Sequence, residues 1–139
     1  MKRILGVDWG EKKMGVSISD ELKISANGIG VFYGDFEEKL KVLKELTEKY
    51  EIEKIVLGIP ISLSGEINKE GEKILKVKDE IEKRLRIQVE LIDERFTTKI
   101  AKERFSFEKK KRQKIKEKKI QDDLTSAIII LNSYLERIK

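Results

Sequence analysis

The chain alternates short apolar runs with longer segments in which apolar residues recur every three or four positions. The runs predict a hairpin within residues 4–20 and further strands at 28–33, 54–58 and 88–92. The helical spacing predicts helices over 36–49, 69–85 and 124–135, and a short helix that begins at Thr97 or Thr98. Three closely joined strands followed by helix–strand–helix–strand–helix predict one α/β domain over residues 1–139. Its sheet would be mixed, with helices on the faces.

The opening hairpin carries the first candidate functional residue, Asp8. Strand alternation places Asp8 on one face with Ile4 and Gly6, while Trp9 faces the other way. A carboxylate at the end of an apolar strand is costly to desolvate unless a cation or hydrogen-bond donors meet it. A second interpretation is structural, with the carboxylate of Asp8 capping the turn that follows.

The amino-acid composition restricts the kinds of catalytic and metal-binding site that the chain can form. The chain has no Cys and no His, so disulfides, thiolate metal sites and imidazole bases are excluded. Any bound metal must have oxygen ligands, which favours Mg²⁺, Mn²⁺ or Ca²⁺. No run of apolar residues is long enough to span a membrane, and an acid interrupts the N-terminal apolar run early. We therefore expect a soluble, cytoplasmic protein without a membrane partner.

Acids stand at three distant places that this topology would bring together. Asp8 ends the first strand, Asp93 and Glu94 end the last strand, and Asp122–Asp123 is expected to open the last helix. Sites in open α/β sheets form at the carboxyl ends of strands. Converging carboxylates without His or Cys predict a cation site, which on a phosphodiester would support two-metal hydrolysis. Alternatively, Asp93 or Glu94 pairs with Arg95 or faces water, and the helix-opening acids favour the positive end of the helix dipole.

Positive charge is concentrated in one stretch, residues 109–119. The chain has a net charge of +5, and this stretch holds eight Lys or Arg and one Glu, or +7, so the remainder carries −2. Such runs are commonly solvated surface, and we expect 106–119 to be a loop or a frayed helix. Its position between Glu94 and Asp123 also suits phosphate contacts, which predicts a nucleic-acid partner. The candidate contacts are Lys109, Lys110, Lys111, Arg112 and Lys114. The aromatics Trp9, Phe105 and Phe107 are candidates for base stacking, with core packing favoured for Phe105.

Several short blocks together resemble the YqgF-type (RuvX) family, whose members are described as Holliday-junction resolvase-like proteins and as pre-16S rRNA nucleases. The blocks follow the family's order and spacing over nearly the whole chain. They are Gly6–Gly10, Lys13–Val16, Ser19–Asp20, Val56–Pro60, Asp93–Thr98, Asp123–Ala127, Ile130–Leu131 and Tyr134–Leu135. Each block is weak alone, and the set is specific.

The resemblance implies an RNase H-like fold, with a five-stranded mixed sheet whose first three strands are antiparallel and which is flanked by helices. It implies a catalytic and metal-binding set of Asp8, Glu94 and Asp123, acting through Mg²⁺ or Mn²⁺ in a two-metal site, with Asp93 as a further candidate ligand. Lys13, Arg95 and Thr97 fall in the same blocks and are candidates for nucleic-acid contact. The implied activity is nuclease processing of the 5′ end of precursor 16S rRNA in ribosome biogenesis, with ribosomal particles as partners.

Two departures from the family pattern stand out. Lys13 replaces the usual Arg, which keeps the charge but loses a bidentate fork. Leu63-Ser64-Gly65 replaces the usual Met-Asp-Gly, which removes one acid.

Three rival hypotheses remain. A Holliday-junction resolvase would favour a homodimer, whereas an RNA-processing enzyme could act as a monomer. A domain of this fold could also bind nucleic acid without cutting it. An actin-like or sugar-kinase ATPase is weaker, because such enzymes need two lobes and 139 residues supply one.

Overall fold

The computed structural model describes residues 2–61, 64–93 and 115–138, with side chains from Asp123 onward in the last segment. Eight helices and strands lie in these segments. In chain order they are β1 (Arg3–Trp9), β2 (Lys13–Ser19), β3 (Ala26–Tyr33), α1 (Phe36–Lys49), β4 (Ile52–Ile59), α2 (Lys69–Leu85), β5 (Gln88–Asp93) and α5 (Ile115–Arg137). None of the described helices is long and apolar enough to cross a membrane.

The strands form one five-stranded sheet in the order β3-β2-β1-β4-β5. β1 pairs with β2, and β2 with β3, in antiparallel fashion, whereas β4 is parallel to both β1 and β5. The prediction of a mixed sheet with three antiparallel strands at the start is confirmed. In this order β1 lies at the centre, with its carboxyl end beside that of β4.

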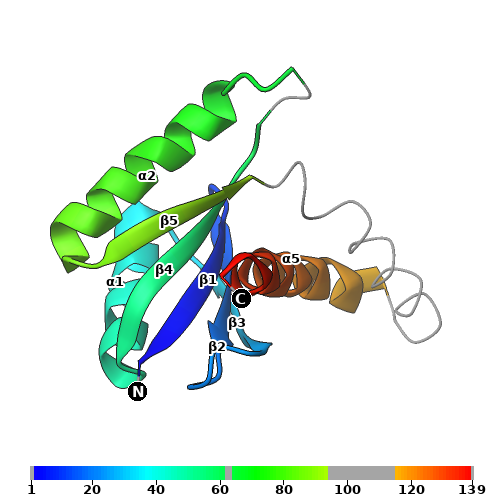
Figure 1. Ribbon diagram of the computed structural model, residues 1–139. Coiled ribbons are helices and arrows are strands. Elements are labelled where there is room, and N and C mark those ends of the chain that lie inside the picture. Colours follow the sequence, from blue (N-terminus) through cyan, green and yellow to red (C-terminus); the bar gives the residue numbers. More distant parts are fainter. Residues whose placement is uncertain (1, 62–63, 94–114, 139) are drawn as a thin grey trace.

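Helices cover both faces of the sheet, with α1 and α2 on one face and α5 on the other (Figure 1). Alternation along β1 supplies both cores: Leu5 and Val7 pack with α1 and α2, and Ile4 packs with α5. Asp8 therefore belongs to the α5 face and Trp9 to the face of α1 and α2, as the sequence predicts.

Helices α1 and α2 have the bounds and the buried apolar faces that the sequence predicts. In α1, the side chain of Asp35 accepts from the Glu38 N–H and the Glu38 carboxylate accepts from the Asp35 N–H, which is a capping box. In α2, the Asn68 side chain accepts from the Gly71 N–H. Their buried stripes contain Leu40, Leu43 and Leu46 in α1 and Ile74, Val77 and Ile81 in α2.

The C-terminal helix is longer than predicted. It begins at Ile115, so residues 115–119 of the basic stretch are helical rather than a loop. Lys, Glu and Gln are good helix formers, and a solvated segment that they dominate can be helical without any apolar spacing. Consequently Asp123 lies about two turns inside α5, and not at its opening. The interpretation of Asp122–Asp123 as acids at the positive end of the helix dipole is therefore wrong.

Candidate active site

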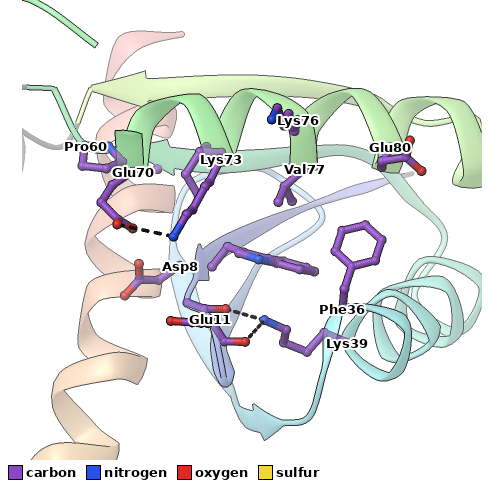
Figure 2. Close-up of a pocket in the computed structure, with 14 residues that line it drawn as sticks. Asp8, Glu11, Phe36, Lys39, Pro60, Glu70, Lys73, Lys76, Val77 and Glu80 are labelled. Atoms are coloured by element: carbon purple, nitrogen blue, oxygen red, sulfur yellow. Dashed lines mark hydrogen bonds and ion pairs between the residues drawn. The ribbon is translucent and has the colours of Figure 1, made fainter. Parts of the chain in front are cut away.

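The carboxylate of Asp8 stands at the carboxyl end of the central strand and on the α5 face. In the sheet register Asp8 lies directly opposite Gly15 of β2. Figure 2 shows its side chain projecting from β1 toward α5 and away from Lys39 of α1. Because Gly15 has no side chain, the space beside Asp8 is open to whatever α5 places there.

What α5 places there is Asp123. A Cβ atom built on Gly15 would lie 2.3 Å from the backbone oxygen of Asp123 and 3.4 Å from the Cβ of Ala127. The helix thus rests directly on the glycine that faces Asp8, and opposite residues of an antiparallel pair are close neighbours. The sequence predicts that Asp8 and Asp123 converge, and this packing brings the backbone of Asp123 against the residue opposite Asp8.

Helix α5 also packs closely against Gly6, which lies two residues before Asp8 on the same face of β1. A Cβ there would meet the Cβ of Leu131 at 2.6 Å and the backbone oxygen of Ala127 at 3.0 Å. Opposite Gly6, the buried hydroxyl of Ser17 donates to the Ala127 carbonyl oxygen over 2.7 Å. Together the glycines and this hydrogen bond fix the height and position of α5 over the sheet.

A cation already sits against the Asp123 carboxylate. The Nζ of Lys13 lies 2.6 Å from Oδ2 of Asp123, an oxygen that is out of contact with solvent. This close contact with Asp123 raises the pKa of Lys13, and the charge of Asp8 adds to the effect. Lys13 is therefore protonated at neutral pH, in the field of both carboxylates.

The other predicted site residues divide into two groups. Val89 and Leu91 of β5 pack on the face of α1 and α2, whereas Ile92 packs with α5, so alternation assigns Asp93 to the face opposite Asp8. The rest lie outside the described residues: Glu94, Arg95, Thr97, Lys109, Lys110, Lys111, Arg112 and Lys114.

The donor set suits a hard divalent cation. Where side chains are described, no group of three or more acids is close enough to hold a metal. The pair of Asp8 and Asp123 nevertheless offers carboxylate oxygens, one of them shielded from water and already matched to a positive charge. Oxygen ligands of this kind are what Mg²⁺ and Mn²⁺ prefer.

Comparison with known proteins places the chain in a family. The family model described as "RuvX: Holliday junction resolvase" matches residues 2–137. The chain belongs to the RuvX family. A relative from Caldanaerobacter subterraneus is 41% identical over 138 residues, covering 99% of this chain and 98% of the relative. Another from Dictyoglomus thermophilum is 40% identical, covering 96% and 95%. Both carry the name "Putative pre-16S rRNA nuclease".

Solved structures share the fold of this RuvX-family chain. Fowlpox virus resolvase in complex with Holliday junction DNA superimposes with a TM-score of 0.59 at 14% identity, covering 98% of each chain. Thermus thermophilus RuvC in complex with a Holliday junction substrate gives a TM-score of 0.59 at 11% identity, covering 99% of this chain and 96% of the other. The RNase H-like fold expected from the sequence is therefore confirmed.

Sequence reasoning did not identify Lys39, which is 1% exposed and supports the turn after Asp8. Its ammonium donates to the backbone oxygens of Gly10 and Glu11, as Figure 2 shows, and lies 4.1 Å from the centroid of the Trp9 ring. Burial lowers the pKa of Lys39. A helical lysine among Leu and Glu is ordinarily a surface residue, so nothing in the sequence marked its role in holding this turn.

A cavity of about 430 Å³ opens beside the same turn, on the face of α1 and α2. Trp9 and Phe36 line it, together with Ile74 and Val77 of α2. Asp8 is also one of its lining residues, so the cavity of the RuvX-family chain reaches the end of β1 that carries the proposed site. Sequence reasoning missed this cavity because its walls come from β1, α1, β4 and α2, and only the tertiary structure brings them together.

Proposed function

We propose that this RuvX-family protein is a divalent-metal-dependent nuclease, and that it trims the 5′ end of precursor 16S rRNA on ribosomal particles. The observation that carries the proposal is the packing of Asp123 onto Gly15, directly across the hairpin from Asp8. Two acidic residues that the sheet and a buried helix face bring to one edge of the sheet are suited to cation-assisted phosphodiester hydrolysis. The family assignment and the names of the relatives support the nuclease activity and the RNA substrate.

Asp8 and Asp123 are the proposed metal ligands, and Glu94 is the proposed third. Glu94 follows directly on Asp93, the last residue of β5, and β5 ends at the same edge of the sheet as β1 because β4 is parallel to both. When bound, Mg²⁺ or Mn²⁺ would activate a water molecule and stabilise the leaving oxygen. The protein's own contribution is to hold the carboxylates rigidly, since β1 is central in the sheet and α5 is buried against it.

Lys13 has two proposed tasks. Without metal, its ammonium neutralises Asp123 and keeps two nearby carboxylates from repelling each other. With metal and substrate in place, the same ammonium is free to contact a phosphate of the strand, because its side chain is 24% exposed at the edge of the site. The basic residues of 109–114, with Arg95 and Thr97, are proposed to hold the nucleic-acid backbone further out.

Cleavage assays test the proposal and select the substrate. Wild type and Asp8→Asn are incubated with a labelled RNA that spans the 5′ end of mature 16S rRNA and with a four-way DNA junction, in Mg²⁺, Mn²⁺ or EDTA. The proposal predicts metal-dependent RNA cleavage by the wild type and none by Asp8→Asn. Equal cleavage by both proteins would refute the carboxylate mechanism.

The junction arm of the assay covers the second candidate function. The family description as a Holliday junction resolvase favours branched DNA as the alternative substrate. Preferential cleavage of the junction over RNA would support that function, provided that sedimentation analysis shows the protein to be a dimer. Salt-sensitive binding of either nucleic acid, with no product in any metal, would instead support a binding module.

A further inference from the structure

The cavity between α1 and α2 is large enough for a small ligand and lies next to the proposed cleavage site. Its volume of about 430 Å³ falls within the range of small-molecule pockets. Part of its wall is formed by Gly10 and Gly58, which have no side chain, and by Asp8. Asp8 belongs both to this wall and to the carboxylate pair. A ligand in the cavity therefore contacts a residue of the proposed metal site.

The interior of the cavity is aromatic and aliphatic. The Trp9 and Phe36 rings meet at a centroid distance of 5.6 Å and an angle of 60°, and Ile74 and Val77 complete the apolar surface. Trp9 remains only half-buried although it packs on the main core. An incompletely covered indole in an apolar recess is suited to stack on a flat, neutral ring.

The charges around the cavity disfavour a phosphate inside it. Lys39 is committed to the turn carbonyls, and Lys73 pairs with Glu70 over 3.6 Å. Figure 2 shows this pair at the end of α2 that overhangs Asp8. The cavity is lined by three lysines, Lys39, Lys73 and Lys76, and by four acids, Asp8, Glu11, Glu70 and Glu80. A neutral base is compatible with such a rim, and carboxylate oxygens can accept from its amino groups.

The same geometry disfavours a basic protein side chain as the occupant. The ammonium of Lys39 already lies over the Trp9 ring at 4.1 Å from the centroid. A second cation on this indole would compete for the same electron density and would be repelled by the first. A nucleobase meets no such penalty.

We propose that this cavity is a subsite for one unpaired nucleobase of the substrate, at the nucleotide adjacent to the cleaved phosphate. The proposal rests on the proposed nuclease function. It implies that the substrate must be single-stranded, or able to unstack one base, at that position. Cleavage would then be selective for unpaired ends and junction points over continuous duplex.

The chain offers a direct probe of this subsite, because Trp9 is its only tryptophan. Short single-stranded RNA is titrated into the wild type in EDTA, where no cleavage occurs, and Trp9 fluorescence is recorded. The series is repeated with RNAs in which one nucleotide at a time is abasic. We expect intact RNA to quench Trp9, and one abasic position to abolish most of the quenching. In Mg²⁺ or Mn²⁺, the same abasic RNA should show a KM raised at least fivefold, with a smaller change in kcat.

A protein variant gives a second, independent readout. Val77→Phe fills the cavity from α2 and should abolish quenching, with Val42→Phe on α1, outside the cavity lining, as a matched control. The abasic series needs no variant, so it decides the matter if Val77→Phe does not fold. Equal quenching and equal KM for intact and abasic RNAs would overturn the subsite while leaving metal-dependent cleavage, and hence the nuclease, in place. Quenching by octa-arginine peptide but not by RNA would overturn it in favour of a basic protein partner.

Discussion

Gly15→Ala is the substitution that most directly connects the packing of this protein to its site. The added Cβ would lie 2.3 Å from the Asp123 backbone oxygen and 2.9 Å from its carbonyl carbon, closer than such atoms approach in real proteins. Neither atom belongs to a flexible side chain, so α5 itself must move away from β2. Overpacking of this kind costs about 1–3 kcal/mol of unfolding free energy. In a domain of this size that corresponds to a decrease in Tm of about 3–12 °C.

The matched control is Gly30→Ala in the neighbouring strand β3. A Cβ there meets only the Phe32 ring, at 3.8 Å, which is an ordinary contact. Alanine is favoured over glycine within strands by roughly 0.5–1 kcal/mol, so the control should be neutral or slightly stabilising. Thermal melts measure both stabilities, and calorimetric titration with Mn²⁺ measures the site. We expect Gly15→Ala alone to lose stability and to bind Mn²⁺ more weakly, because Asp123 is displaced from Asp8. Equal Tm values for the two variants would refute the packing argument.

Three further predictions concern the contacts around α5. Lys13→Met should bind Mn²⁺ more tightly, since it removes the ammonium that competes for Asp123, and calorimetry showing weaker binding would contradict this. Because the pKa of Lys13 is raised in the folded state, the stability from its ion pair is fully present below pH 10.5 and is lost as the pH rises through the folded-state pKa. The difference in unfolding free energy between wild type and Lys13→Met should therefore be constant from pH 6 to 9 and shrink above about pH 10.5. Ser17→Ala removes the buried hydrogen bond to Ala127 and should lower the unfolding free energy by about 0.5–1.5 kcal/mol in urea titrations. An unchanged midpoint of the urea transition would contradict this.

The elements with regular hydrophobic spacing could be predicted from the sequence, and the reason is their burial. The stripe of Leu40, Leu43 and Leu46 faces a core, so its period is visible, and Asp35 marks its start. The strands are similarly visible as β-branched runs, although β3 and β4 begin two residues earlier than predicted. By contrast, the first turns of α5 have a sequence dominated by Lys, and no apolar period reveals them.

The sequence indicated which acids to propose for the candidate site, but it did not indicate the groups that support them. An acid at the end of an apolar strand is a local signal that indicates Asp8, whereas the choice of Asp123 over Asp122 came from the resemblance to the family. The roles of Gly15 and Lys39 depend on a helix and a turn that are distant in sequence, so only the tertiary structure reveals them. The face of Asp93 could also not be assigned until the register of β5 was known.

Electron paramagnetic resonance of Mn²⁺ measures directly whether Asp8 and Asp123 hold a divalent cation. The free-ion signal is titrated against wild type, Asp8→Asn, Asp123→Asn and the control Asp79→Asn, whose carboxylate lies on the exposed face of α2. We expect wild type and Asp79→Asn to bind Mn²⁺ alike, and both site variants to lose at least tenfold in affinity. Binding by the site variants that equals that of the wild type would contradict it.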